Sequence, residues 1–220
     1  MMKKSDNTIE YYNKRASEYE QIYYRKVPER RKEIDDEVFR LKEIAKNKTV
    51  LDAPCGTGYW TQFLSETAHE IYAADISGEM INEAKKKKYI TPVNFVKSDL
   101  LKLPFKNNFF DLFVLGFWFS HHPKQDYDSL FQLFNNITKP DGKIWLIDNN
   151  YPAEGPKQES VAIDKFGNNY KFRYLDNGNK FTILKNYFTK NELESIFSHH
   201  FKIERLTYNT YYWATVLSHK

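Results

Sequence analysis

The chain has 220 residues, with 33 lysines and arginines against 29 aspartates and glutamates, so its formal net charge is +4. That surplus is too small to imply a polyanionic partner without a clustered basic patch, and the length fits one large α/β unit better than two independent cores. Apolar residues make up 41% of the chain, with only 8 glycines and 8 prolines. This composition excludes disordered, collagen-like and linker classes.

The sequence also bears on the compartment. Cys55 is the only cysteine, so neither an intrachain disulfide nor a multi-cysteine zinc site is expected, as suits a reducing cytosol. The longest apolar run, Leu112 to Phe119, is too short to cross a bilayer, and the polar N-terminus lacks the apolar stretch of a secretion signal. We expect a soluble, cytoplasmic protein without membrane contact, either a monomer or a weak homodimer.

Residues 1–48 have a helical pattern and are expected to form a lid. One helix is predicted by apolar residues spaced three and four apart: Ile9, Tyr12, Ala16, Tyr19 and Tyr23. A second helix is predicted from Pro28, because proline suits the first helical position. Its buried side would comprise Ile34, Val38, Leu41 and Ile44. The tyrosines of the first helix, with Arg15, would either cover a ligand or pack in the core.

After Asn47 the chain alternates between short β-branched runs and helical stretches. The predicted strands span residues 49–53, 70–75, 93–97, 110–116 and 143–148, and the predicted helices span residues 58–65, 78–88 and 126–137. This alternation predicts an α/β fold, a doubly wound and mostly parallel sheet with its ligand sites at the carboxyl ends of the strands.

The segment 149–185 interrupts that alternation and predicts a hairpin that caps the substrate. The turn Asp176–Asn179 contains an Asn-Gly pair between two alternating runs, a strong hairpin signal. Tyr170, Phe172 and Tyr174 would then form one aromatic face, with Lys171 and Arg173 on the other face.

The last part of the chain predicts one helix and two strands. Thr189 and Glu192 form a capping box, so a helix should run from there to about Ser198. The runs 201–208 and 211–218, joined by a short link, predict a terminal antiparallel pair.

Three acidic residues stand at the ends of three successive predicted strands. Asp52 precedes a small-residue loop in which Gly56 and Gly58 allow backbone to approach a ligand closely. Asp75 ends the next strand, about 20 residues later, where a carboxylate can hold ribose hydroxyls. Asp99 ends the third strand and could accept a bond from an adenine amino group. Together the three acids predict a nucleoside ligand, although each alone fits an ordinary strand-to-helix turn.

With this set, the sequence from Val50 onward resembles the class I S-adenosylmethionine-dependent methyltransferases, most strongly as far as Gly116. The resemblance implies a Rossmann-like, seven-stranded sheet whose last strand is antiparallel, with an N-terminal helical cap and a hairpin insertion before the last helix. It also implies S-adenosyl-L-methionine as the cofactor. The implied cofactor-binding residues are Tyr12, Tyr19, Asp52, Pro54, Gly56, Thr57, Gly58, Asp75, Ile76, Asp99, Leu100 and Gly116. Pro54 departs from the glycine of many members and has no amide hydrogen to donate.

Competing chemistries lack residues that they need. A nicotinamide dehydrogenase requires a third glycine where this chain has Thr61. Enzymes that methylate exocyclic base nitrogens use an Asp/Asn-Pro-Pro-aromatic element where this chain has the run Gly116 to Phe119. Cys55 is interpreted as a small loop residue, and no metal site is expected because the adjacent histidines lack ligand spacing.

The acceptor is expected to be a small, partly apolar or aromatic molecule with an oxygen or nitrogen nucleophile. Its predicted contacts are Phe117, Trp118, His122, Asn149 and Tyr151, and His121 is the candidate general base. Two alternatives remain open: an RNA methyltransferase whose aromatic residues stack on a base, and a non-catalytic cofactor-binding protein. A cluster of Lys157, Lys165, Lys171, Arg173 and Lys180 around the pocket would favour RNA, whereas dispersion would favour a small molecule.

Overall fold

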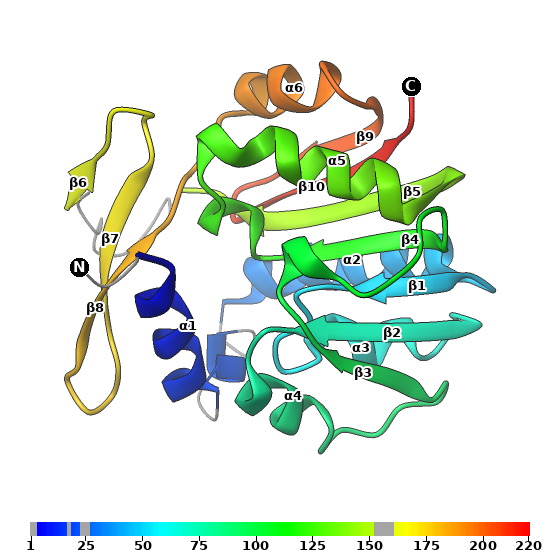
Figure 1. Cartoon of the computed structure of the whole chain (residues 1–220), viewed down its shortest axis with the longest axis horizontal. Helices are drawn as coiled ribbons and strands as arrows, with labels where there is room; N and C mark the ends of the chain where they lie inside the picture. The colour runs from blue at the N-terminus through cyan, green and yellow to red at the C-terminus, as the bar shows by residue number, and fades with distance from the viewer. Residues whose placement is uncertain (1–3, 17–18, 23–26, 152–160) are drawn as a thin grey trace.

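The computed structural model describes residues 4–16, 19–22, 27–151 and 161–220. Its main sheet has seven strands in the order β3-β2-β1-β4-β5-β10-β9 (Figure 1). The strands are β1 (Thr49–Asp52), β2 (Glu70–Asp75), β3 (Val93–Lys97), β4 (Phe110–Gly116), β5 (Thr138–Asn149), β9 (Lys202–Tyr208) and β10 (Tyr212–Ser218). β1 to β5 pair in parallel, whereas β10 is antiparallel to both β5 and β9. The predicted fold class is therefore confirmed, including the antiparallel last strand.

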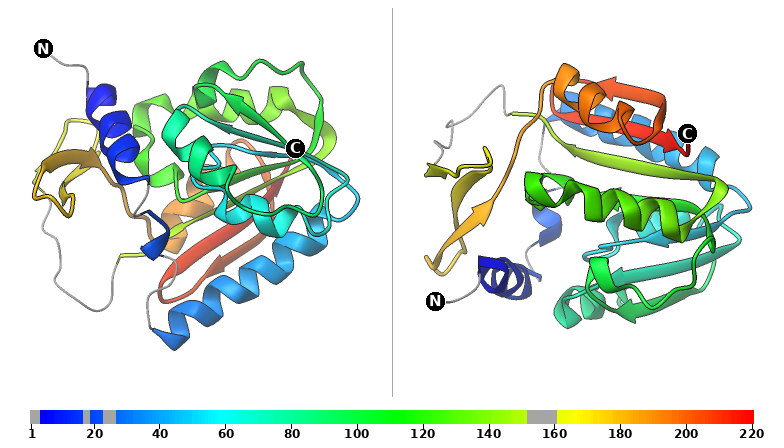
Figure 2. Two further views of the ribbon diagram at one scale, coloured as in Figure 1. Left: turned by 90° about the horizontal axis from the view of Figure 1, so that it is seen from below. Right: turned by 45° about the horizontal axis from the view of Figure 1, so that its top comes forward.

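Helices cover both faces of this sheet (Figures 1 and 2). α5 (Tyr127–Ile137) and α6 (Lys190–Ser198) pack on one face, and α2 (Pro28–Ala45) and α3 (Tyr59–Leu64) pack on the other. α4 (Gly78–Ala84) follows β2, and three short 3₁₀ turns follow β3 and β4: η2 (Leu100–Lys102), η3 (Phe119–His121) and η4 (Lys124–Asp126). Of the helices described, none combines the length and apolarity needed to cross a membrane.

β1 lies between β2 and β4 in the sheet. The strands β2 and β3 follow on one side of β1, and the strands β4 and β5 follow on the other side, so the strand order reverses at β1. In doubly wound sheets such a switch point opens a crevice at the carboxyl ends of the strands. The loops after β1, β2 and β4 therefore meet at one edge, where a ligand site is expected.

Several element boundaries differ from the predicted ones. The helix after β2 ends at Ala84 rather than near residue 88, and β5 begins at Thr138 rather than 143, directly after α5. The single helix predicted over residues 9–23 is wrong: α1 (Lys4–Arg15) ends first, and η1 (Tyr19–Ile22) is a separate 3₁₀ turn. Tyr23 and Tyr24 lie outside the described residues. Periodicity could not detect the break, because the apolar spacing continues across it.

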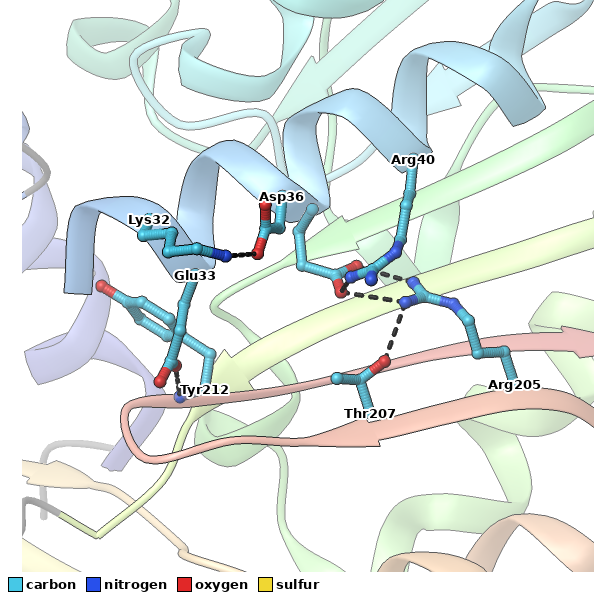
Figure 3. A network of polar contacts seen from close by, with 8 residues as sticks. Lys32, Glu33, Asp36, Arg40, Arg205, Thr207 and Tyr212 are labelled. Atoms are coloured by element: carbon cyan, nitrogen blue, oxygen red, sulfur yellow. Dashed lines mark hydrogen bonds and ion pairs between the residues drawn. The ribbon is translucent and has the colours of Figure 1, made fainter. Parts of the chain in front are cut away.

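The start of α2 is anchored to the β9–β10 hairpin by charged side chains (Figure 3). The buried Glu37 carboxylate accepts hydrogen bonds from Arg205, at 2.6 and 2.9 Å, and from Arg40 at 2.8 Å. Glu33 accepts the backbone N–H groups of residues 210, 211 and 212. These bonds fix Arg30, one turn earlier, against Tyr212 at the start of β10.

A second, three-stranded sheet lies beside the main one (Figure 1). It comprises β6 (Ala162–Ile163), β7 (Asn169–Tyr174) and β8 (Lys180–Leu184), and α1 packs against β8 and α4. The hairpin predicted at residues 176–179 is confirmed, as is its position before α6, whose capping box is also formed. The aromatic face differs from expectation, because Tyr174 is 61% exposed while Lys171 on the opposite face is 1% exposed.

Candidate functional site

Two adjoining cavities open at the carboxyl ends of the strands, with volumes of about 740 and 1630 Å³ including their open mouths. The first lies over the loop after β1 and the ends of β2 and β4, whereas the second extends from the end of β3 to η3 and the hairpin. They share the side chains of Ile9, Pro54, Ile76 and Trp118. One ligand could therefore occupy the first cavity while reaching toward a second ligand in the other.

The glycine loop after β1 is held in place by Asp75. Its carboxylate accepts the backbone N–H of Gly56 at 2.9 Å and that of Ser77 at 2.8 Å. Gly56 has φ +54° and Gly58 has φ +78°, conformations that favour glycine, and a Cβ on Gly58 would lie 2.5 Å from the Tyr89 hydroxyl. Burial raises the pKa of Asp75, partly opposed by these backbone bonds. The loop thus leaves its backbone and one carboxylate facing the first cavity.

Asp52, expected beside the cofactor, lies beneath the loop and does not line either cavity. It is fully buried, and its Oδ2 accepts a 2.5 Å hydrogen bond from the Thr61 hydroxyl. Within the described part of the chain its Oδ1 has no hydrogen-bond partner. Burial raises the pKa of Asp52 to about 7, with the nearby Asp75 adding to the rise. The carboxyl is thus poised between its neutral and charged forms at physiological pH.

The floor of the first cavity fits a ligand with a polar end. Gly116 allows the Trp60 indole to lie against the backbone at the end of β4, because a Cβ at this position would overlap the indole nitrogen. The buried Trp60 Nε1–H has no acceptor among the described residues, although it belongs to a side chain that lines the cavity. A ligand carboxylate would satisfy this donor. Phe117, with φ +56°, begins the turn that carries Trp118 between the two cavities.

α1 reaches the site through Tyr12. Its hydroxyl lies 3.0 Å from Nε2 of His121, whose Nδ1 lies 2.6 Å from the carbonyl oxygen of Leu184. A carbonyl only accepts, so Nδ1 carries the proton and Nε2 accepts from Tyr12. Burial, followed by the positive charge of Lys185, lowers the pKa of His121 to about 3. His121 is therefore a neutral imidazole at physiological pH, with its basic nitrogen bonded to the Tyr12 hydroxyl.

A second contact holds the N-terminal segment over the glycine loop. Glu20 in η1 accepts a 2.8 Å hydrogen bond from the Thr57 hydroxyl, and it also forms an ion pair with Lys87. Tyr19 of the same turn lines the first cavity. Lys87, which follows α4, thus fastens this segment to the loop.

Behind His121 lies a buried ion pair between Lys185 and Asp148, 2.9 Å apart. Lys185 also donates to the Ser120 hydroxyl at 2.6 Å, and Asp148 accepts the backbone N–H of Ser120 at 2.9 Å. Burial raises the pKa of Asp148, but Lys185 and His121 outweigh it and bring that pKa below its usual range. This pair fixes η3, and with it His121, against the end of β5.

Most of the predicted site residues meet in these cavities. The first is lined by the predicted residues Tyr12, Tyr19, Pro54, Gly56, Thr57, Asp75, Ile76, Gly116, Phe117 and Trp118, and the second by Pro54, Ile76, Asp99, Leu100, Trp118, His121 and His122. Four predicted residues line neither cavity: Asp52, Gly58, Asn149 and Tyr151. Gly58 instead forms the N-cap of α3, and Asn149 accepts a hydrogen bond from Arg30.

Sequence reasoning missed some residues of the site. Trp60, Met80 and Gln125 line the cavities, and Glu20, Asp148 and Lys185 hold them together. Tyr170, on the predicted aromatic face of the hairpin, lines the second cavity. Asp148 could have been found from the sequence, because it is an acidic residue near the end of a strand, as Asp75 is. Lys185 and Glu20 carried no such signal, since their partners are distant in sequence.

Comparison with known proteins supports the resemblance to methyltransferases seen in the sequence. A family model described as a methyltransferase domain matches residues 50–142. The demethylmenaquinone methyltransferase of Bacillus licheniformis is 30% identical over 121 residues, which cover 53% of this chain and 51% of that protein. The chain thus spans about half the length of the curated relatives it matches. Residues 50–142 thus match the methyltransferase domain family.

Solved structures show how far the shared fold extends. The complex of DhpI with SAM and HEP is 24% identical, with a TM-score of 0.77 and 98% of each chain covered. The 1,6-didemethyltoxoflavin-N1-methyltransferase of Burkholderia thailandensis is 18% identical, with a TM-score of 0.56, and the match covers 93% of this chain and 87% of that one. The likeness in fold therefore includes the N-terminal helices and the hairpin as well as the main sheet.

Proposed function

We propose that this chain transfers a methyl group from S-adenosyl-L-methionine to an oxygen or nitrogen atom of a small, partly apolar or aromatic molecule. The observation that carries the proposal is the pair of adjoining cavities. One lies on the glycine loop and Asp75, the other lies against His121 and the hairpin, and Trp118 belongs to both. Relatives named as acting on demethylmenaquinone and on 1,6-didemethyltoxoflavin support a small-molecule acceptor.

The cofactor would extend across both cavities. Asp75 would bind ribose hydroxyls, because each carboxylate oxygen that accepts one backbone bond has a second lone pair. The Trp60 indole N–H and the backbone of Gly56 would meet the methionine end, whereas Ile76, Asp99 and Leu100 would surround the adenine. The bound cofactor supplies an electrophilic methyl group on a sulfonium sulfur.

The protein's own part in the reaction is positioning and the exclusion of water. The acceptor must direct a lone pair in line at the methyl group, and holding it there supplies much of the rate acceleration. Tyr12 and Tyr19 line the first cavity from the N-terminal segment, and Trp118, which lines both cavities, would lie between the cofactor and the acceptor. A base is needed only when the reacting atom carries a proton.

His121 remains the candidate for that base, although its basic nitrogen is already bonded to the Tyr12 hydroxyl. As a neutral imidazole bonded to Tyr12 it could take a proton only if the acceptor displaces or shares that bond. If it acts so, His121→Ala should lower turnover by about 10² to 10⁴ while cofactor affinity stays constant. His122→Ala is the matched control, because His122 lines the same cavity but its Nε2 donates to the Asp126 carbonyl oxygen instead. Unchanged turnover in His121→Ala would assign it a structural role.

Calorimetry tests the cofactor assignment. Asp75→Ala should weaken S-adenosylmethionine binding about 100-fold, since charge-assisted hydrogen bonds to ribose are lost. Asp111→Asn is the control, because Asp111 lies at the start of β4 and bonds Lys139 and the Thr49 backbone. Equal affinity in the wild type and Asp75→Ala would refute the assignment.

Screening then separates the acceptor classes. The enzyme would be incubated with methyl-labelled cofactor and either metabolite pools or total RNA. Label in the metabolite fraction supports the proposal, whereas label in RNA favours the alternative of an RNA methyltransferase. Binding without transfer to either pool would favour a non-catalytic cofactor-binding protein.

A further inference from the structure

The β7–β8 hairpin has two faces, because side chains alternate along each strand. Three cross-strand pairs share one face, here called the hairpin strip: Tyr170 with Leu184, Phe172 with Thr182, and Tyr174 with Lys180. The other face is formed by the remaining two pairs: Lys171 with Ile183, and Arg173 with Phe181. One face can therefore pack on the protein while the other meets a ligand.

The face opposite the strip packs against α1, which lies beside β8 (Figure 1). The ring of Phe181 lies 5.5 Å from that of the buried Tyr11 in α1. Asn168, just before β7, holds the base of the hairpin to η4: it accepts the Lys124 backbone N–H at 2.8 Å and donates to the Gln125 side chain at 2.8 Å. The hairpin is thus fixed at its base and along one face, and the strip is directed away from α1.

The strip begins inside the second cavity and ends in solvent. Tyr170, Thr182 and Leu184 line that cavity. Two residues further along β7 is Phe172, which is half-buried, and two further again is Tyr174, which is 61% exposed. Strand residues rise about 3.3 Å each, so the strip runs roughly 13 Å from Tyr170 to Tyr174. A molecule in the second cavity therefore has an aromatic path to the surface beside it.

The dimensions of the strip suit part of a small molecule and not a protein partner. Neighbouring strands lie about 4.8 Å apart, so a two-stranded strip roughly 13 Å long offers on the order of 100 Å². A stable protein interface buries about 800 Å² on each partner. The inner end of the strip is also out of a protein's reach, because Leu184 is 8% exposed. The occupant that fits is a ligand already seated in the cavity.

The cations of the hairpin region stand apart from the cavities. Four of them line neither cavity: Lys165, Lys171, Arg173 and Lys180. Lys157 lies outside the described residues. Nucleic acid is bound by basic side chains gathered on one accessible surface. The dispersion of these cations therefore favours a small acceptor over RNA.

Lys180 is the one charged residue of the strip. Its Nζ lies 3.3 Å from the centre of the Phe172 ring, and the side chain is exposed. Exposed contacts between a cation and a ring are weak, and a lysine can keep its methylenes on an apolar surface while the ammonium turns to water. An apolar chain can therefore take the place of the ammonium on Phe172.

We propose that the methyl acceptor carries an apolar chain, which leaves the second cavity along the hairpin strip while the reacting head stays beside Trp118 and His121. This inference rests on the proposed function and adds the acceptor's shape to it. Tyr170, Phe172 and Tyr174 contact successive parts of the chain, because they stand two residues apart on one face. The strip therefore selects acceptors by the length of that chain.

Ligands that differ only in chain length test the proposal. The full chain, saturated with S-adenosylhomocysteine, would be titrated calorimetrically with para-methylphenol, para-butylphenol and para-hexylphenol, which share one neutral head. Burying a methylene raises affinity up to about fourfold, so we expect para-hexylphenol to bind roughly 30 times as tightly as para-methylphenol, or more. A series whose affinity does not rise with chain length, including one in which no member binds, would overturn the proposal.

Variants locate the contact. Replacing both strip rings, Phe172→Ser with Tyr174→Ser, should lower the hexyl-to-methyl affinity ratio about fivefold or more and leave para-methylphenol binding unchanged. Tyr174→Ser alone, at an exposed ring, is a second test that spares the fold. Phe39→Ser is the control, because Phe39 is a 68% exposed ring on α2. An unchanged ratio in the double variant, with thermal unfolding showing it folded, contradicts the proposal.

Cofactor affinity separates this result from failure of the proposed function. S-adenosylhomocysteine binding, measured in the same proteins, depends on Asp75 and not on the strip. Loss of that binding in the wild type would refute the proposed function, on which the inference rests. A flat chain-length series with cofactor binding intact would refute the inference alone.

Discussion

The two halves of the proposed site, one for the cofactor and one for the acceptor, are built in different ways. In the cofactor half, the loop after β1 and the end of β2 lie about 20 residues apart, and backbone amides, glycines and one carboxylate shape the cavity. In the acceptor half, Tyr12, His121, Asp148 and Lys185 come from four distant segments and are joined by side-chain bonds. The first half follows from local chain geometry, whereas the second exists only when the helix, hairpin and sheet are assembled.

The largest expected change in stability comes from breaking the buried ion pair between Lys185 and Asp148 in the acceptor half. Lys185→Met should lower the free energy of unfolding by about 3 to 5 kcal/mol, because it leaves Asp148 buried without its partner. Urea denaturation measures the change. Lys139→Met is the control, because its pair with Asp111 is half-exposed and should cost less than about 1 kcal/mol. Similar losses in both variants would show that the acceptor half does not depend on this pair.

A smaller change in the free energy of unfolding, this time a gain, is expected when Asp52 in the cofactor half is replaced. The pKa of Asp52 is raised to about 7, so the folded protein holds this proton more tightly than the unfolded chain. The contribution of Asp52 to stability is therefore complete below about pH 4 and is lost as the pH rises through 7. Asp52→Asn keeps an acceptor for Thr61 and removes the buried charge, so without cofactor it should gain up to about 4 kcal/mol over the wild type by pH 8.

The measurement is the difference in unfolding free energy between the two proteins from pH 4 to pH 8. It should grow with pH. A constant difference would mean that the Asp52 carboxyl has an ordinary pKa, and that the cofactor half tolerates its charge.

The smallest effect concerns Tyr12, where the two halves meet. Tyr12→Phe removes the hydrogen bond to His121 and should destabilise the docking of α1 by about 1 kcal/mol. Amide hydrogen exchange in residues 9–16 should therefore be faster in the variant, and adding cofactor should slow it in the wild type. Tyr174→Phe is a control on an exposed hairpin tyrosine. If the exchange rate of residues 9–16 is the same with and without cofactor, α1 is a packing element and not a lid.

Sequence alone determined the order of strands and helices and the position of the glycine loop. Hydrophobic periodicity and capping residues act over a few residues, which is why β2, β3 and β4 were predicted with their observed bounds and the Thr189 capping box was found. The strand-end acids Asp75 and Asp99 were located for the same reason, since parallel strands bring their carboxyl ends to one edge.

Tertiary structure decided burial and charge. The pattern at Asp52 could not reveal that its carboxylate lies beneath the loop against Thr61, nor could the hairpin's alternation reveal that Lys171 is buried while Tyr174 is exposed. The tautomer of His121 depends on Leu184 and Tyr12, 63 and 109 residues away in the chain. A pKa and a solvent exposure depend on every neighbour in space, and only the assembled fold determines which residues become neighbours.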